Sequence, residues 1–182
     1  LLNFTGTEGP NLGSSPEAAL VQGSDGNFYG TTPFGGADDQ GTIFRMTAEG
    51  VLTTLFEFGK NDNGSRSYAA LIQGNDGDFY GTTYLGGIGY GTAFKITLSG
   101  ELTTLVQFTG VEGPNSSALV LGSDGNFYGT ASTGGADYTG AVFMMTPEGA
   151  LTTLVEFSGT GATDVGAFPE GALILSGSGD LY

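Results

Sequence analysis

The chain has 182 residues, and 19 acidic against 4 basic side chains give it a formal net charge of −15. Nucleic acids and anionic membrane surfaces both require a basic patch, so neither is expected as a partner. The sequence contains no His and no Cys, which excludes a Ser-His-Asp or Cys-His catalytic set, a disulfide framework and a His-ligated zinc site within it. No apolar run approaches the ~20 residues of a spanning helix, so no membrane insertion is expected here.

A short stretch recurs along the chain and sets its organisation. It reads DGNFYGTT at residues 25–32, DGDFYGTT at 76–83 and DGNFYGTA at 124–131, and a reduced copy, SGDLY, ends the chain at 178–182. The copies lie roughly fifty residues apart, a spacing typical of repeat architectures built from one supersecondary unit.

Each unit holds four short apolar runs separated by turn residues. An Asp-Gly pair joins the first two runs, and it is a strong hairpin signal because Gly accepts positive φ without steric cost. A Gly-Gly loop precedes the third run and a tight turn precedes the fourth. No segment has a sustained helical period, so we predict almost no helix. In the first unit the runs are 18–22, 28–32, 42–47 and 52–58.

Four antiparallel strands at this period predict a β-propeller blade, and therefore an all-β fold. Ile43 points to one face of the third strand and Phe44 and Met46 to the other, as expected where neighbouring blades cover both faces. Gly30 lies inside a strand, as do its counterparts Gly81 and Gly129, which indicates a bulge or the close approach of another backbone. The alternative is a β-solenoid, whose coils are usually shorter and lack a hairpin in each.

We interpret residues 1–182 as one repeat domain that contains about three and a half blades of a larger propeller. Residues 1–4 align with the end of a fourth strand and would close a preceding blade. Full blades are predicted at 18–58, 69–108 and 117–157, and residues 171–182 form the first hairpin of the next blade. Both ends then carry unpaired strands. Either the sequence is a segment of a longer chain, which we favour, or copies self-associate through their open ends by sharing a composite blade.

The repeated motifs resemble a known family. Units of the form Ala-Leu-x-x-Gly-x-Asp-Gly-Asn-Phe-Tyr-Gly-Thr-Thr, followed by Gly-Gly, Gly-Thr-x-Phe-x-x-Thr and Gly-x-Leu-Thr-Thr-Leu-x-x-Phe, are similar to the GloVer tandem repeats of bacterial proteins with a choice of surface anchor. The resemblance spans essentially the whole chain. It implies an exported protein, extracellular or held at the cell surface of a bacterium, but it implies no activity. A weaker likeness links the hairpin to NHL propellers.

The aspartates of the hairpin turns are candidate metal ligands. Ca²⁺ prefers several oxygen ligands, and each turn offers one or two carboxylates. The alternative is that each Asp accepts hydrogen bonds from the backbone of its own turn. We favour the alternative and expect no cofactor, because the EF-hand spacing is absent. The residues concerned are Asp25, Asp76, Asp78 and Asp124.

The loops after the second and fourth strands should share one face of the propeller, and they carry carboxylates beside aromatic side chains. Such a face can bind carbohydrate or another surface ligand, or it can be only a solvated rim. Its acidic members are Glu8, Glu17, Asp38, Asp39, Asp137, Asp164 and Glu170. The residues proposed to contact a ligand are Asp38, Asp39, Arg66, Tyr68, Tyr90, Asp137 and Tyr138.

Two functions follow from different readings of this face. The favoured one is a non-catalytic surface module for ligand binding, adhesion or assembly, because the repeat is regular and common catalytic residue types are missing. The alternative is a carbohydrate-active enzyme, a polysaccharide lyase or glycoside hydrolase, since carboxylate pairs ~5–9.5 Å apart serve as acid and base in glycosidases. The loop at 60–68 departs from the repeat through Arg66 and Tyr68, as an active-site blade would.

Overall fold

The computed structural model describes residues 3–59, 63–109, 118–159 and 166–182, and in these ranges the chain forms strands and no helix. Twelve strands form three sheets of four, which we call blades 1, 2 and 3, and within each blade the strands pair antiparallel in chain order. The strands are β1 Val21–Gln22, β2 Phe28–Thr32, β3 Thr42–Met46 and β4 Leu52–Glu57 in blade 1; β5 Ile72–Gln73, β6 Phe79–Thr82, β7 Thr92–Ile96 and β8 Leu102–Gln107 in blade 2; and β9 Val120–Leu121, β10 Phe127–Ala131, β11 Ala141–Met145 and β12 Leu151–Glu156 in blade 3.

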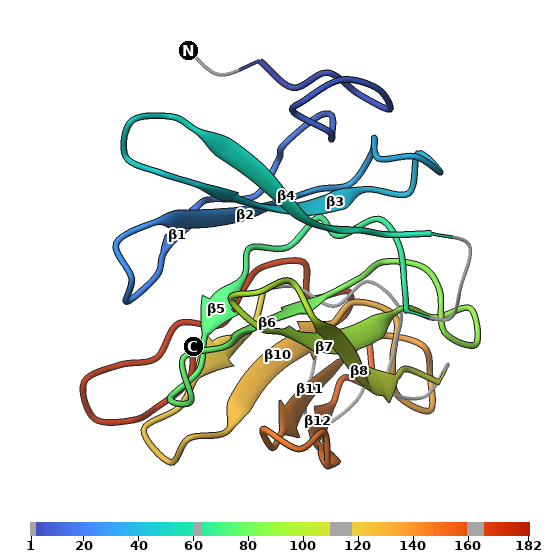
Figure 1. Ribbon diagram of the computed structural model, residues 1–182. Helices are drawn as coiled ribbons and strands as arrows, with labels where there is room; N and C mark the ends of the chain where they lie inside the picture. Colours follow the sequence, from blue (N-terminus) through green and yellow to red (C-terminus); the bar gives the residue numbers. More distant parts are fainter. Residues whose placement is uncertain (1–2, 60–62, 110–117, 160–165) are drawn as a thin grey trace.

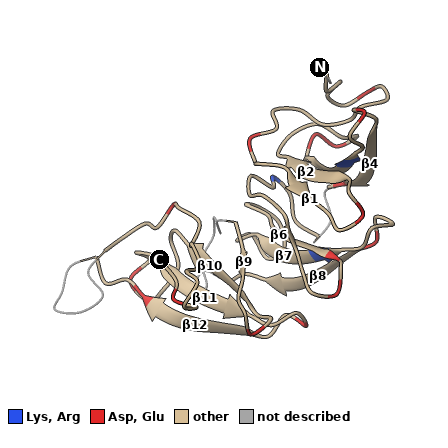
Figure 2. Ribbon diagram, turned by 90° about the vertical axis from the view of Figure 1, so that its left-hand side faces the viewer, with Lys and Arg blue, Asp and Glu red and all other residues tan. Residues whose placement is uncertain are grey.

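The three blades follow one another as successive layers, as the two ribbon views show (Figures 1 and 2). This arrangement of four-stranded antiparallel sheets confirms the predicted β-propeller architecture. In Figure 2 the acidic residues are spread over the turns and loops of all three blades, whereas basic residues are few.

Each blade is irregular at the same place. The pairing of the third and fourth strands shifts register between Ile43 and Phe44, and again at the corresponding positions of blades 2 and 3. A shift of this kind increases the local twist of a sheet. Its recurrence shows that the three blades share the same irregularity at the same place.

The glycine inside each second strand makes room for side chains of its own blade. A Cβ on Gly81 would lie 2.6 Å from Cζ of Phe94 and 2.8 Å from Cδ2 of Leu71. Gly81 pairs directly with Phe94 across the sheet. The predicted crowding is therefore present, but the neighbours are side chains of adjacent strands, and the expectation of another backbone was wrong.

The hydrophobic cores lie between the blades. The core between blades 1 and 2 combines buried Tyr29, Ile43 and Phe58 with Leu71, Phe79, Phe94 and Ile96. Ring centroids of Tyr29 and Phe79 are 4.1 Å apart, and those of Phe58 and Phe94 are 5.7 Å apart. The next interface repeats both contacts, Tyr80 with Phe127 at 4.1 Å and Phe108 with Phe143 at 5.6 Å. Each blade therefore buries its apolar faces against its neighbours.

A hydroxyl in the second strand ties blade 1 to blade 2, and another ties blade 3 to the segment that follows it. Thr31 Oγ1 donates to the backbone oxygen of Ala69 at 3.1 Å, and Thr130 Oγ1 donates to that of Gly171 at 3.1 Å. Since a buried hydroxyl without a partner is costly, these bonds favour one register between successive blades.

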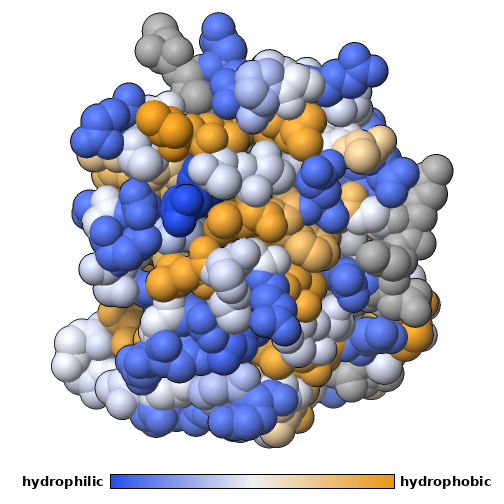
Figure 3. Space-filling view, in the orientation of Figure 1, coloured by the Kyte–Doolittle hydropathy of each residue, from blue (hydrophilic) through white to orange (hydrophobic). Residues whose placement is uncertain are grey.

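Some side chains in the first blade and in the last hairpin are exposed, whereas their counterparts between two blades are buried. Leu20 in blade 1 is 46% exposed, whereas its counterparts Leu71 and Leu119 are each 4% exposed. Tyr182 in the last hairpin is 75% exposed, against 0% for Tyr29. Figure 3 shows apolar residues in patches between hydrophilic ones on one face of the molecule.

Residues near both ends of the chain repeat contacts that occur within and between the blades. Phe4 makes an edge contact with Phe44 at 5.1 Å, the relation that Phe58 has to Phe94. Residues 174–182 form a hairpin in which Ile174 and Tyr182 exchange backbone hydrogen bonds of 2.8 and 2.9 Å. The domain boundaries and the self-association through open ends stay predictions. Among the described residues, no helix has the length and apolar character needed to cross a membrane.

Candidate functional site

One cavity of the described structure is lined by segments from successive repeat units. Its volume is about 690 Å³, which is within the range of ligand sites. It combines residues from the loops that precede the first strands with residues that follow the second strands. We call it the axial pocket, and it is lined by Glu17, Tyr68, Ala69, Ala70, Thr82, Tyr84, Ala118, Ser132, Glu170 and Ala172.

Three lining residues occupy one repeat position. Glu17, Tyr68 and Glu170 each stand three residues before the Leu of a first strand. Two residues earlier the backbone is left-handed in every case, with φ of 56° at Ser15, 60° at Arg66 and 55° at Phe168. Non-Gly residues rarely adopt this conformation. Its recurrence in three units indicates a structural kink that directs the following side chain to the axis.

The kink is held by the preceding blade. The backbone N–H of Arg66 donates to the oxygen of Gln40 at 3.0 Å, and that of Phe168 donates to the oxygen of Thr139 at 2.6 Å. Blade stacking therefore fixes the direction of Tyr68 and Glu170, although these residues are distant in sequence from the loops that hold them.

Two tyrosines form an aromatic wall of the pocket. Tyr68 and Tyr84 meet edge to face with centroids 5.8 Å apart, and they are 38% and 41% exposed. Phe34 extends the row, with its centroid 6.3 Å from that of Tyr68. Exposed aromatic faces held rigid by their neighbours are suited to contact a ligand at low entropic cost.

Arg66, which precedes Tyr68 by two residues, is not part of the pocket lining. Its guanidinium carbon is 4.2 Å from the centroid of the Phe34 ring, a cation–π arrangement. Its buried Nη1 atom has no hydrogen-bond partner among the described residues. Arg66 therefore packs on the ring next to Tyr68 and does not itself line the pocket.

Glu17 and Glu170 supply the carboxylates of the pocket. Both side chains are exposed, and in the described part of the chain neither makes a hydrogen bond or ion pair with a protein group. No Lys or Arg belongs to the lining. The pocket is thus a negatively charged cavity with an aromatic wall and a floor of small alanine side chains.

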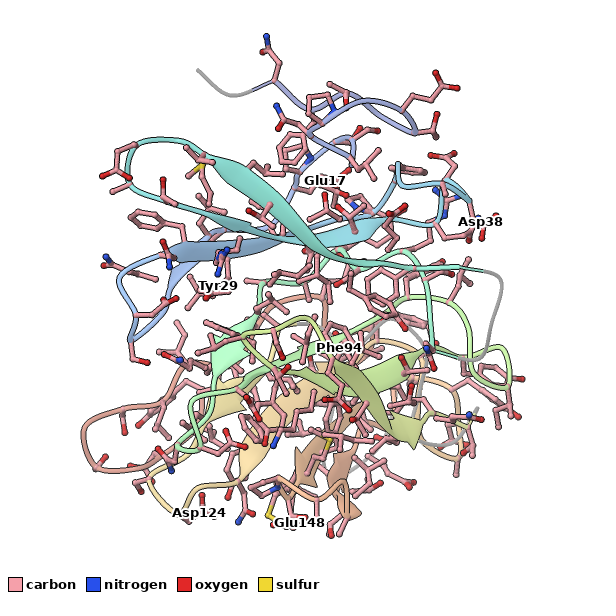
Figure 4. All side chains as sticks on the ribbon, viewed as in Figure 1. Glu17, Tyr29, Asp38, Phe94, Asp124 and Glu148 are labelled. Atoms are coloured by element: carbon pink, nitrogen blue, oxygen red, sulfur yellow. The ribbon has the colours of Figure 1, made fainter. Side chains whose placement is uncertain are left out.

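Most of the residues proposed to contact a ligand lie away from this pocket. Tyr68 lines it, whereas the other proposed residues in the loops after the second strands do not. Figure 4 shows Asp38 at the outer edge of blade 1. Asp39 accepts a hydrogen bond from the backbone N–H of Gly35 at 2.8 Å, so one of its oxygens stabilises the loop. The residues outside the lining are Asp38, Asp39, Arg66, Tyr90, Asp137 and Tyr138.

Tyr84 and Ser132 are pocket residues that the sequence reasoning missed. Both follow a second strand, at the position that Pro33 occupies in the first unit. The residue at this position differs in each unit although the residues before it are nearly constant, and this variation could have indicated a ligand contact. Glu17 and Glu170 were recognised as part of the acidic face but were not ranked among the ligand contacts.

The turn aspartates have structural partners. Asp25, Asp76 and Asp124 each accept a hydrogen bond of 2.8 Å from the Tyr hydroxyl four residues later. Asp25 also accepts from the backbone N–H of Asn27 at 3.1 Å, as the turn-capping alternative requires. Lys95 pairs with Asp76 at 2.7 Å and with Asp78 at 2.8 Å.

The pKa values of Asp25, Asp76 and Asp124 are lowered by the hydrogen bonds that these carboxylates accept. The Asn126 side chain is the main cause at Asp124, and the Asn27 side chain at Asp25. Partial burial acts to raise the pKa of Asp76, but bonds from Lys95 and Tyr80 outweigh it, so that this pKa is also lowered. Among the described residues, no group of three or more carboxylates is placed to hold a metal ion.

The Tyr partners give the fold a pH dependence at the alkaline end. Burial, followed by the hydrogen bond to Asp, raises the pKa of Tyr29 and of Tyr80 from 10.0 to about 12. A raised folded pKa stabilises the protein fully below pH 10, and this stabilisation is lost as the pH rises through 12. We expect the melting temperature to fall over this interval. The double variant Y29F/Y80F should show a smaller fall, and an equal fall in both proteins would contradict the assignment.

A second cavity of about 330 Å³ lies between the turns of blades 2 and 3. Asp76, Asp124 and Glu148 contribute to it, and Figure 4 shows Asp124 and Glu148 at the lower edge of the molecule. Because Asp76 and Asp124 are engaged by tyrosines, this cavity offers fewer free groups than the axial pocket.

The sequence pattern of a known repeat family matches the whole chain. The family is the Gloeobacter/Verrucomicrobia repeat, and its model matches residues 1–182. The chain belongs to the Gloeobacter/Verrucomicrobia repeat family. This match confirms the family resemblance that the repeated motifs indicated. A comparison with curated protein sequences gives no match.

Solved structures similar to this Gloeobacter/Verrucomicrobia repeat protein are β-propellers. A virginiamycin B lyase from Staphylococcus aureus has 19% identity and a TM-score of 0.57, with 90% of this chain and 53% of the lyase covered. A streptogramin B lyase has 16% identity and a TM-score of 0.56, with coverage of 90% and 52%. A putative gluconolactonase has 17% identity and a TM-score of 0.59, with coverage of 98% and 55%. The chain therefore spans about half the length of the structures that it matches, and the likeness concerns the fold alone.

Proposed function

We propose that this repeat protein is a non-catalytic module, extracellular or at the surface of a bacterium, that binds a carbohydrate in the axial pocket. The observation that carries the proposal is the pair of exposed tyrosines, Tyr68 and Tyr84, in one pocket with the carboxylates of Glu17 and Glu170, which have no partner among the described residues. The faces of sugar rings pack on aromatic side chains, while carboxylates accept hydrogen bonds from hydroxyls. Residues on loops held by a rigid scaffold are where binding functions concentrate.

The location at the cell surface rests on the family resemblance and is a proposal of its own. Protease treatment of intact cells should remove the protein if it is exposed at the surface. Protection from the protease in intact cells, with digestion after lysis, would contradict this location.

The binding proposal is tested with a matched pair of tyrosine variants in the same blade. Tyr84 is 41% exposed and lines the pocket, whereas Tyr90 is 42% exposed and does not. Against an oligosaccharide panel measured by calorimetry, we expect Y84A to weaken binding about tenfold or more, because aromatic residues dominate contact energies. Y90A should bind as the unchanged protein does. Equal losses in the two variants, or no binding to any oligosaccharide, would contradict the proposal.

The alternative is a carbohydrate-active enzyme, a lyase or hydrolase. One observation favours it: Glu17 and Glu170 share one cavity, and paired carboxylates can serve as the acid and the base of a glycosidase. Turnover of a bound polysaccharide that disappears in E17Q or E170Q would establish the alternative. Binding without turnover supports the non-catalytic module.

A further inference from the structure

The charge of the axial pocket restricts what can bind there. Its two ionisable acids, Glu17 and Glu170, face no basic lining residue. Two of the basic side chains are engaged elsewhere: Lys95 with Asp76 and Asp78, and Arg66 on the ring of Phe34. The whole chain carries a net charge of −15, so the field around the pocket repels anions and attracts cations.

We propose that the ligand class of the axial pocket is an amino sugar that carries a protonated amine. This inference rests on the proposed carbohydrate site. It adds that the bound carbohydrate is positively charged. Acidic sugars such as uronates are disfavoured, because their carboxylates would meet Glu17 and Glu170 with no compensating cation in the lining.

The geometry suits a ligand that is both cationic and ring-shaped. The carboxylates come from opposite ends of the array, Glu17 before blade 1 and Glu170 before the last hairpin, while Tyr68 and Tyr84 come from blade 2. An ammonium group can pair with a carboxylate, and it is also attracted to the face of a tyrosine ring. The sugar ring itself packs on the remaining aromatic surface and on the small side chains of Ala69 and Ala70.

The kink at the repeat position supports a pocket built to hold these groups. Glu17 and Glu170 follow left-handed residues and, in each case, a proline. Proline fixes its own φ and so restricts the backbone next to the carboxylate-bearing residue. At this repeat position the backbone before Glu17 and Glu170 is thus restricted by proline, whereas the unit that contains blade 2 carries the aromatic residue Tyr68.

The test compares glucosamine oligomers with N-acetylglucosamine oligomers of the same length, which differ in charge but share the ring. Calorimetry is performed with the 182-residue chain at low salt and at a pH where the amine is protonated. We expect the glucosamine oligomer to bind about tenfold more tightly. E17Q and E170Q should each reduce this preference, and the double variant should abolish it while it still binds the acetylated oligomer.

E148Q is the matched control, because Glu148 is an exposed carboxylate of the second cavity. The preference should survive in E148Q. If E148Q lowers it as much as E17Q does, general attraction of polycations explains the data and the inference is overturned. Equal affinity for both oligomers, together with weakened binding in Y84A, overturns the amino-sugar class but keeps the carbohydrate site. Absence of binding to either oligomer and to the wider panel overturns both.

Discussion

Substitution L71A is expected to lower the free energy of unfolding by about 2–5 kcal/mol, whereas L20A lowers it by about 1 kcal/mol or less. The two leucines hold the same place, directly before the first strand of successive blades. Leu71 is 4% exposed and belongs to the core between blades 1 and 2, whereas Leu20 is 46% exposed. The difference between the two variants therefore measures the packing of one blade on another, with strand propensity held equal.

Urea denaturation of the 182-residue chain, followed by circular dichroism and by tyrosine fluorescence, gives both free energies. Agreement of the two signals is needed first, because repeat arrays can lose two-state behaviour. L119A serves as the second internal position, since Leu119 is also 4% exposed. It should resemble L71A. Equal effects of L20A and L71A would contradict the stacking of blades as the source of stability.

Much of the fold can be predicted from the sequence because its determinants are local. The Asp-Gly pair at Asp25 and Gly26 fixes a hairpin within a few residues, and Gly26 adopts the expected positive φ of 81°. The spacing of such turns then gives the length of the repeat unit, and the four apolar runs within a unit give its strands. The role of Gly81 was harder to predict, because its neighbours Phe94 and Leu71 belong to other strands and only the folded sheet brings them together.

The axial pocket depends on contacts that local patterns do not contain. Tyr84 and Glu170 are 86 residues apart in the sequence, and they share a cavity only because the two interfaces between blade 2, blade 3 and the last hairpin have formed. The partnership of Asp25 with Tyr29 was likewise not predicted, although a signal existed. Asp and Tyr stand four residues apart in all three complete copies of the motif, and each such pair forms a hydrogen bond across its hairpin.

The second large effect is expected from G100A, compared with G50A. Both glycines end the tight turn before the fourth strand, and their φ values are similar, 91° for Gly100 and 86° for Gly50. Alanine at either position incurs the cost of the left-handed conformation, about 1–2 kcal/mol. A Cβ on Gly50 meets nothing within 4 Å, whereas a Cβ on Gly100 would lie 2.5 Å from the backbone oxygen of Leu55 in blade 1.

Only G100A therefore has to displace a neighbouring blade, because a backbone oxygen cannot rotate away as a side chain can. We expect G100A to lower the free energy of unfolding by about 2 kcal/mol or more beyond the loss in G50A. Gly149 provides a replicate, since its Cβ would lie 2.7 Å from the backbone oxygen of Leu105 in blade 2. Urea denaturation of the three variants makes the comparison. If G50A is as destabilised as G100A and G149A, the cost arises within the turn and the close approach of successive blades contributes nothing to it.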